Sequence, residues 1–227
     1  MADPDRFAAV LCAATLLSAC SSESGAKTRP DAAQAAVRAA DAGQPSRDGA
    51  ANADSPEPSR WVGQVEDTDV RVGIVADSAH ALLFFCGGAS SFATATRWFS
   101  LDIGEGTAKF EDETWHVDAR LEPNRVSGEV TRDDGVVRPF SAQRVAPDTL
   151  AGLYEGQASC GRLGLIVIQP NQTAPIEAQG ACVGPGHAPE QVNPILPVAQ
   201  DNGEIPVLEP GAEDATVRLH SLQLTPP

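Results

Sequence analysis

The sequence predicts an all-β protein made largely of antiparallel strands. From Trp61 onward, apolar and polar residues alternate with a period of two, which is the pattern of strands with one buried face. Short turn-forming groups such as EPN and DDG interrupt the alternation roughly every 8–12 residues, as in sandwiches and barrels. No stretch shows the 3.6-residue periodicity of a long helix. We therefore expect an antiparallel meander that forms a barrel or clam, or two small β units, after a signal segment and a disordered linker.

The chain begins with a short apolar segment. Residues 7–17, FAAVLCAATLL, follow a single basic residue, Arg6, although Asp3 and Asp5 depart from the usual positive flank of a signal. A membrane-spanning helix needs about 20 residues, so this run is too short to remain in a bilayer as a helix. It has the length and position of the apolar region of a secretion signal. We predict that the chain is exported.

The apolar segment is followed closely by a cysteine. The residues Leu17-Ser18-Ala19-Cys20 resemble the lipobox of bacterial lipoproteins, which is aliphatic, small, small, Cys. The resemblance implies that residues 1–19 are a lipoprotein signal peptide, that Cys20 receives a diacylglycerol, and that its new amino terminus is acylated. Two or more acyl chains hold a protein stably on a bilayer. The implied location is the cell envelope, on the outer surface of a membrane. The alternative is that Cys20 is an ordinary residue near an ordinary cleavage site.

Residues 20–60 are predicted to be a lipid-anchored, disordered linker. From Ser21 to Arg60 the chain has no aromatic residue, and its one large aliphatic residue is Val37. Such a segment cannot bury enough apolar area to offset its conformational entropy. A flexible chain of this length has an r.m.s. reach of about 35 Å. We expect it to hold a folded domain clear of the lipid surface.

Residues 61–145 are predicted to form a β-meander unit. Val70, Val72, Ile74 and Ala76 alternate onto one face, whereas residues 80–87, HALLFFCG, form a continuous apolar run typical of a strand buried on both faces. Residues 90–99 have room for a single helical turn, and DG at 134–135 favours a tight hairpin turn. The predicted strands cover residues 61–66, 69–77, 80–87, 97–104, 107–112, 114–122, 125–132 and 136–144.

Residues 150–227 are predicted to be a second β unit, or a continuation of the same domain. Three strands are expected at residues 150–159, 161–169 and 176–184, with two short strands at 204–209 and 215–224. Residues 184–203 contain several prolines and are interpreted as a loop.

The cysteines predict one disulfide in the folded part. Cys12 leaves with the signal and Cys20 carries lipid, so three cysteines remain, and an odd number leaves at least one free or paired with another chain. An exported context permits disulfides. Cys160 and Cys182 lie just before and within two neighbouring predicted strands, so we expect them to pair. Cys86 lies in the apolar run LLFFCGG and is expected to be a small buried residue.

The charge distribution excludes one class of partner. Residues 61–227 carry 23 Asp and Glu residues against 10 Lys and Arg residues, so this part is strongly acidic. Double-stranded nucleic acid is a poor partner because its phosphates would be repelled. The partners we expect are the membrane, through the lipid anchor, and an envelope protein or small ligand. The simplest role of the charge is solubility.

No catalytic, metal or cofactor motif is present in the sequence, so we predict a non-enzymatic protein. The G-x-S-x-G motif, the paired spacings of a zinc site and the EF-hand pattern are all missing. An exported hydrolase with an unrecognised site remains an alternative, and it requires two or more polar side chains to converge in a partly buried pocket. The residues that we would expect to converge are His116, Asp118, Glu111, Asp102 and Glu155.

Two features sharpen these alternatives. Strand alternation places His116 and Asp118 on the face opposite Trp115 and Val117, so His116 is expected to face solvent. A carrier of a small apolar ligand is a further alternative, and it requires an apolar cavity of several hundred Å³ in the barrel interior.

The folded part resembles a group of exported β-rich domains of unknown role in high-GC bacteria. The resemblance extends over roughly residues 61–224 and implies export and a β fold, but no activity. Gly87 stands where the similar proteins have an acidic residue, and Cys160 and Cys182 are local additions. The motifs that carry the resemblance are FFCGG (84–88), WF (98–99), RPFSAQ (138–143), AGLYEG (151–156), GLIVI (164–168) and GACVG (180–184).

Overall fold

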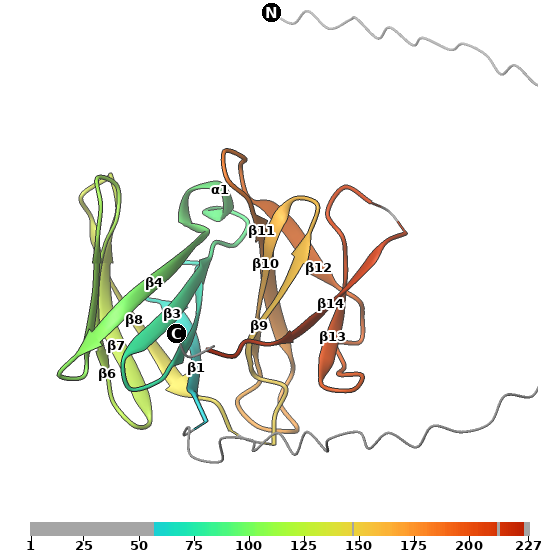
Figure 1. The fold of residues 1–227 in the computed structure, drawn as a ribbon, viewed down its shortest axis with the longest axis horizontal. Coiled ribbons are helices and arrows are strands. Elements are labelled where there is room, and N and C mark those ends of the chain that lie inside the picture. Colours follow the sequence, from blue (N-terminus) through green and yellow to red (C-terminus); the bar gives the residue numbers. More distant parts are fainter. Residues whose placement is uncertain (1–56, 147, 213, 225–227) are drawn as a thin grey trace, which may run out of the picture. The chain divides into compact units, whose positions relative to one another are not determined.

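Two closed antiparallel barrels make up the part of the chain that the computed structural model describes, residues 57–146, 148–212 and 214–224 (Figure 1). The all-β prediction is therefore confirmed, in the version with two β units. The signal segment, Cys20 and residues 20–56 of the predicted linker lie outside the described residues. The first strand begins at Ser59, two residues before the predicted start at Trp61.

The first barrel is an eight-stranded meander. Each strand pairs with its neighbour in the chain, and the last strand closes onto the first. The strands are β1 (Ser59–Val65), β2 (Arg71–Ala76), β3 (His80–Cys86), β4 (Arg97–Gly104), β5 (Thr107–Glu111), β6 (His116–Leu121), β7 (Arg125–Thr131) and β8 (Val137–Arg144). The single helical turn expected between residues 90 and 99 is α1 (Phe92–Ala95).

The second barrel has six strands and closes by pairing of its last strand with its first. The strands are β9 (Gly152–Ala158), β10 (Gly161–Ile168), β11 (Glu177–Val183), β12 (Glu190–Pro194), β13 (Glu204–Leu208) and β14 (Thr216–Ser221). Strand β12 corrects the prediction of a loop over residues 184–203. It contributes one buried side chain, Val192, and its pairing with β13 spans only Asn193 and Pro194, so local alternation gave little signal.

Large side chains fill the interior of the first barrel. Val70, Val72, Ile74 and Ala76 all belong to its core, as the alternation predicted. The aromatic rings at the centre meet edge to face, with the Phe85 centroid 5.5 Å from that of Phe99 and 5.4 Å from that of Phe140. Edge-to-face pairs of this kind stabilise a core beyond the burial of their area.

The second barrel has its own core and its own covalent link. Leu163, Leu165 and Val167 of β10 pack inside it with residues of β13 and β14. Cys160 and Cys182 form a disulfide, as predicted. The disulfide closes a loop with a sequence separation of 22 residues. It restricts the unfolded chain, and in the chain-entropy model this adds roughly 3 kcal/mol to the free energy of unfolding.

A third apolar cluster joins the two barrels, which belong to one compact unit. Phe84 and Cys86 point outward from β3 and pack against second-barrel residues that include Leu153 and Ile166. Leu83 and Phe85 point into the first barrel. Strand β3 is therefore buried on both faces, as predicted, and the second barrel covers its outer face. The fully buried Cys86 is the free cysteine of the described region, and burial raises the pKa of its thiol to about 12.

Close backbone approach and polar contacts complete the junction. Gly164 of β10 lies so near β3 and β4 that a Cβ atom there would come within 2.7 Å of the rings of Phe84 and Trp98. At the edge of the apolar cluster, Gln179 Nε2 donates to the backbone oxygens of Asp69, at 3.2 Å, and of Cys86. These contacts fix how the two barrels meet.

We predict that Gly164→Ala weakens the junction. The added methyl group overpacks the contact with Phe84 and Trp98, so the free energy of unfolding should fall by about 1–3 kcal/mol in guanidinium titrations. Gly104→Ala is the matched control, because a Cβ atom there meets nothing within 4 Å. It should leave stability unchanged or raise it by less than about 1 kcal/mol. Equal effects of the two substitutions would contradict the close approach at Gly164.

Candidate functional site

Two of the five residues expected to converge in a hydrolase, His116 and Glu111, lie side by side, but on an exposed strand surface and not in a partly buried pocket. His116 Nδ1 lies 3.8 Å from Glu111 Oε2 across the β5–β6 pair, and the His116 side chain is 49 % exposed, facing solvent as expected. Asp118 instead pairs with Lys109, with 2.6 Å between Nζ and Oδ2. General acid–base catalysis requires groups within hydrogen-bond reach of one substrate atom, and this open strand surface does not provide that arrangement.

The two remaining residues of the expected set lie elsewhere. Asp102 is on β4 with its side chain 97 % exposed, and its Oδ1 lies 3.8 Å from Nε2 of His80. Glu155 belongs to the second barrel, where its Oε2 accepts hydrogen bonds from Arg162 Nε at 3.0 Å and Nη2 at 2.6 Å. In the described part of the chain, no group of three or more His, Cys, Asp or Glu side chains lies close enough to hold a metal ion.

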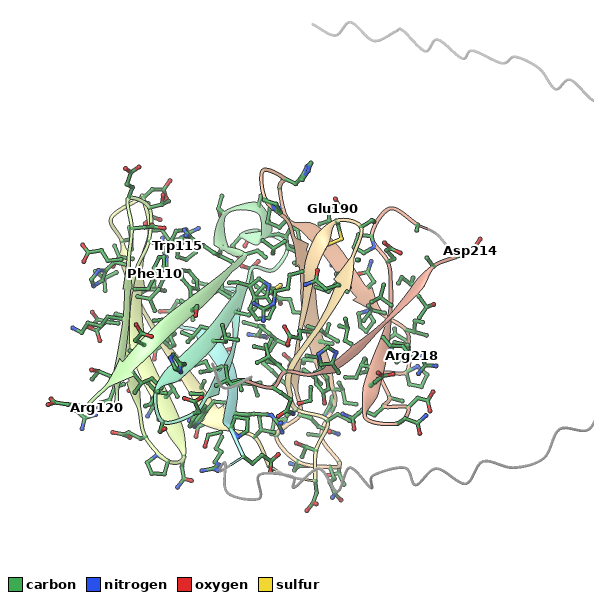
Figure 2. The ribbon with its side chains drawn as sticks, viewed as in Figure 1. Phe110, Trp115, Arg120, Glu190, Asp214 and Arg218 are labelled. Atoms are coloured by element: carbon green, nitrogen blue, oxygen red, sulfur yellow. A yellow bond between two sulfur atoms is a disulfide. The ribbon has the colours of Figure 1, made fainter. Side chains whose placement is uncertain are left out.

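The interior of the first barrel does not offer the cavity that a carrier of a small apolar ligand needs. The core of the first barrel is packed with buried side chains, and the space at its mouth amounts to about 40 Å³. This volume is far below the several hundred Å³ that a ligand-filled barrel needs. Binding of a larger partner must therefore use the outer surface. Figure 2 shows charged side chains projecting from both barrels, among them Arg120 of β6 and Arg218 of β14.

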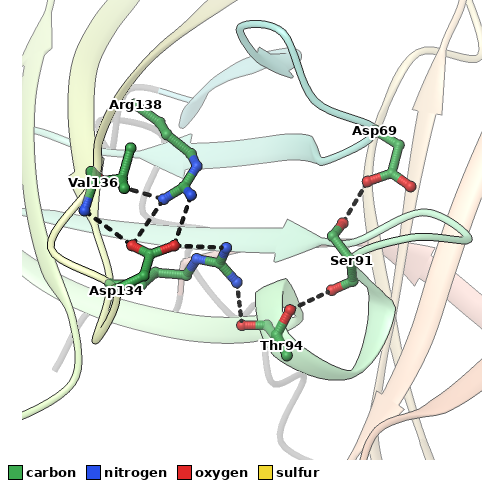
Figure 3. Close-up of polar contacts among 7 residues, drawn as sticks. Asp69, Ser91, Thr94, Asp134, Val136 and Arg138 are labelled. Carbon is green, nitrogen blue, oxygen red and sulfur yellow. Dashed lines mark hydrogen bonds and ion pairs between the residues drawn. The ribbon is translucent and has the colours of Figure 1, made fainter.

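The mouth of the first barrel holds an arginine–aspartate cluster built on the β7–β8 hairpin, which we call the mouth cluster: Arg132, Asp134 and Arg138 (Figure 3). Gly135 adopts a φ of 69° at the turn, which leaves Asp134 free to accept a hydrogen bond from the backbone of Val136 at 3.0 Å. Arg138 binds both oxygens of Asp134, with Nη1–Oδ1 at 3.1 Å and Nη2–Oδ2 at 2.6 Å. The Arg138 hydrogen bonds, followed by that of Val136, lower the pKa of Asp134 to about 2.

Arg132 completes the mouth cluster with weaker contacts. Its Nη1 donates to the backbone oxygen of Thr94 at 3.0 Å, which links the hairpin to α1. Its Nη2 lies 3.5 Å from the Asp134 oxygen that Arg138 already binds. The guanidinium also lies over the ring of Trp115, 5.9 Å from the centroid.

Asp69 holds the loop before α1 in place (Figure 3). Its Oδ2 accepts from the backbone N of Ser90 at 2.7 Å and from the Ser90 hydroxyl at 2.6 Å, while Oδ1 accepts from the Ser91 hydroxyl. The Ser90 and Ser91 hydroxyl bonds hold the pKa of the Asp69 carboxyl well below its usual range. The charged carboxylate therefore positions one wall of the barrel mouth.

A groove of about 840 Å³ runs between the barrels beside α1, and we call it the junction groove. Arg162 reaches into it from the second barrel and lies over Trp98 of the first, 3.8 Å from the ring centroid. Arg97 lines the same groove and pairs with Asp112, with 2.6 Å between Nη2 and Oδ2. The second barrel closes it with Gly184, Pro185, Gly186, His187 and Pro189.

Neither the mouth cluster nor the junction groove followed from the sequence. The DG turn at 134–135 was recognised, but nothing in the local sequence singled out the flanking Arg132 and Arg138. Pairing of β6 with β7 places Arg132 beside Trp115, and the tertiary fold brings it to Thr94. Residues far apart in the chain, such as Trp98 and His187, form the walls of the junction groove. No local sequence pattern could therefore predict it.

Comparisons with known proteins add no family. A scan against protein-family models returns no match, and searches of curated proteins and of solved structures also return none. The resemblances to bacterial lipoproteins and to exported β-rich domains therefore stay predictions. Among the described residues, no helix has the length and apolar character needed to cross a membrane.

We predict that Asp69→Asn reduces stability at neutral pH and flattens its acid dependence. A carboxyl with a lowered pKa stabilises the fold at pH values above its unfolded pKa, near 4, and this contribution is lost as pH falls towards the folded pKa. The loss at pH 7 should be about 1 kcal/mol, because the group lies near solvent. Urea titrations at pH 7 and pH 3 measure both effects. Asp102→Asn, at a 97 % exposed side chain, should change neither, and an equal response of both variants would refute the role of Asp69.

Proposed function

We propose that this chain is a lipoprotein of the cell envelope, anchored in a membrane through Cys20, whose two-barrel body binds an envelope protein without catalysing a reaction. The observation that carries the binding part is the junction groove. It takes its walls from both barrels, and a buried apolar cluster holds those barrels together. A surface fixed in this way can bind a partner without first ordering itself, which lowers the entropic cost of association.

The anchoring part rests on the first sixty residues. The sequence LSAC at 17–20 provides the acylation signal, and the polar residues that follow contain nothing that would form a core. Strand β1 begins at Ser59, so the folded body starts where this composition ends. The proposed tether of about 40 residues would let the body reach partners roughly 35 Å from the lipid surface.

The chemistry of the junction groove favours a polar partner with some apolar area. Arg97 and Arg162 are each neutralised by a carboxylate, Asp112 and Glu155, so the groove does not depend on attraction of a strong opposite charge. Aromatic and arginine side chains are enriched at the centre of protein interfaces, and the Arg162–Trp98 stack supplies both types. The His116–Glu111 pair and Asp102 lie on exposed strand surfaces and not in a shared pocket, which supports binding rather than catalysis.

We predict that Cys20→Ser releases the protein from the membrane. Mass spectrometry of the wild-type mature chain should find an acylated Cys20 at its amino terminus, and fractionation should place the chain with membranes, because the acyl chains supply the anchoring energy. Cys12→Ser is the matched control, since Cys12 lies in the segment removed. It should not change acylation. A mature chain that starts at an unmodified residue other than Cys20 would contradict the anchor.

We predict that the partner contacts the junction groove. A photo-crosslinking amino acid in place of His187, an exposed residue of the groove, should give a discrete adduct with an envelope protein after irradiation of intact cells. The same amino acid in place of Arg120, exposed on β6 outside the groove, serves as the control and should give no such adduct. Adducts at Arg120 but not at His187 would move the binding surface away from the groove.

A further inference from the structure

The mouth of the first barrel contains a small cavity with an apolar floor and a charged rim. Its volume is about 40 Å³. The floor is made by core residues, among them Phe85, Trp115 and Val130, all of which are buried. Arg132 and Arg138 of the mouth cluster lie at the same cavity. Two guanidinium groups therefore border a space that is otherwise lined mainly by hydrocarbon.

The charges at this rim do not balance. Asp134 uses both of its carboxylate oxygens on Arg138, and Arg132 reaches one of those oxygens only at 3.5 Å. Among the described residues, no other carboxylate lies within ion-pair distance of Arg132. The Arg132 side chain is only 18 % exposed. A largely buried cation that shares its counter-ion gains from any anion that can approach it.

The two hydroxyl groups at the cavity already donate to protein oxygens. The Thr68 hydroxyl donates to the backbone oxygen of Val65 at 3.0 Å, and the Ser91 hydroxyl donates to Asp69. The hydrogen-bond donors that remain for a ligand among the side chains at the cavity belong to Arg132, Arg138 and the indole N–H of Trp115. The cavity is therefore suited to a group that only accepts hydrogen bonds and carries a negative charge, which is the chemistry of a carboxylate.

The size of the cavity limits the rest of the ligand. One water needs about 10–15 Å³ of such volume, so a space of about 40 Å³ admits a tail of only a few carbon atoms. We propose that the mouth of the first barrel binds a short aliphatic carboxylate, with its carboxylate on Arg132 and its alkyl tail on the Phe85–Trp115 floor. This site is separate from the junction groove, so its test is independent of the envelope partner.

Titration of the full chain with sodium propionate tests the proposal. Nuclear magnetic resonance of the Trp115 indole N–H, at constant ionic strength set with sodium chloride, should show a saturable shift. Propionamide has the same shape without the charge and should bind at least about tenfold more weakly, because charge-assisted hydrogen bonds to Arg132 are lost. Octanoate should also bind more weakly than propionate, because its tail exceeds the cavity.

Two variants separate the head group from the tail. Arg132→Gln should weaken propionate binding at least about tenfold, whereas Arg125→Gln, at the exposed start of β7, should leave it unchanged. Ala95→Val places a larger side chain at the cavity and should also weaken binding, although both arginines remain. This second variant keeps the test decisive if Arg132→Gln fails to fold.

Several outcomes would overturn the proposal. One is the absence of a saturable shift with propionate. Equal binding of propionamide would remove the role of the charge, and tighter binding of octanoate would indicate adsorption to exposed apolar surface. Unchanged affinity in both folded variants, Arg132→Gln and Ala95→Val, would place the ligand elsewhere.

Discussion

The arrangement of the described region depends on one buried apolar contact, the face that β1, β2 and β3 turn towards β9 and β10. A barrel normally exposes the outward residues of its strands, and here Val62, Val75 and Phe84 would meet water if the second barrel were absent. Leu153 and Ile166 cover them instead. Burial of side chains of this size stabilises by roughly 1.5–3 kcal/mol each. The two barrels therefore share one rigid body, although each has its own closed ladder of hydrogen bonds.

This contact also creates the surfaces that bear on function. Gly164 permits the close approach that lets Trp98 stack on Phe84, with ring centroids 4.4 Å apart, and Arg162 then covers the other side of Trp98. The walls of the junction groove are thus fixed by packing beneath them. Gln179 donates hydrogen bonds across the junction to backbone oxygens of the first barrel. Because hydrogen bonds are directional, they fix the orientation of one barrel relative to the other more closely than apolar contact does.

Part of the acidic composition has a structural use. Asp77 accepts from the backbone N of Ala79 and His80, and Asp112 accepts from that of Thr114 and Trp115, all between 2.7 and 2.8 Å. Asp134 does the same at its own turn. In Asp77 and Asp112 these backbone bonds are the main cause of a lowered pKa. Aspartates in tight turns accept hydrogen bonds from backbone N–H groups that the strand ladders leave free. Part of the negative charge therefore stabilises the turns, in addition to its effect on solubility.

The sequence alone determined what depends on neighbouring residues. Alternation placed Val70, Val72, Ile74 and Ala76 in one core. The continuous apolar run at 80–87 marked β3 as buried on both faces, and residues 90–99 had room for the turn of α1. The positions of Cys160 and Cys182 beside two adjacent strands were sufficient to predict their disulfide. These features follow from strand periodicity and chain connectivity, which are local properties.

Only the tertiary structure decided the rest. Strand β12 was missed because it buries one side chain and ends at Pro194, so its identity comes from the strands beside it. The choice between one barrel and two, the contact of Arg162 with Trp98, and the meeting of Arg132 with Thr94 join residues distant in the chain. Such contacts depend on barrel closure and on the packing of one barrel against the other. A pattern of period two records which side chains point inward, but not which surface they will meet.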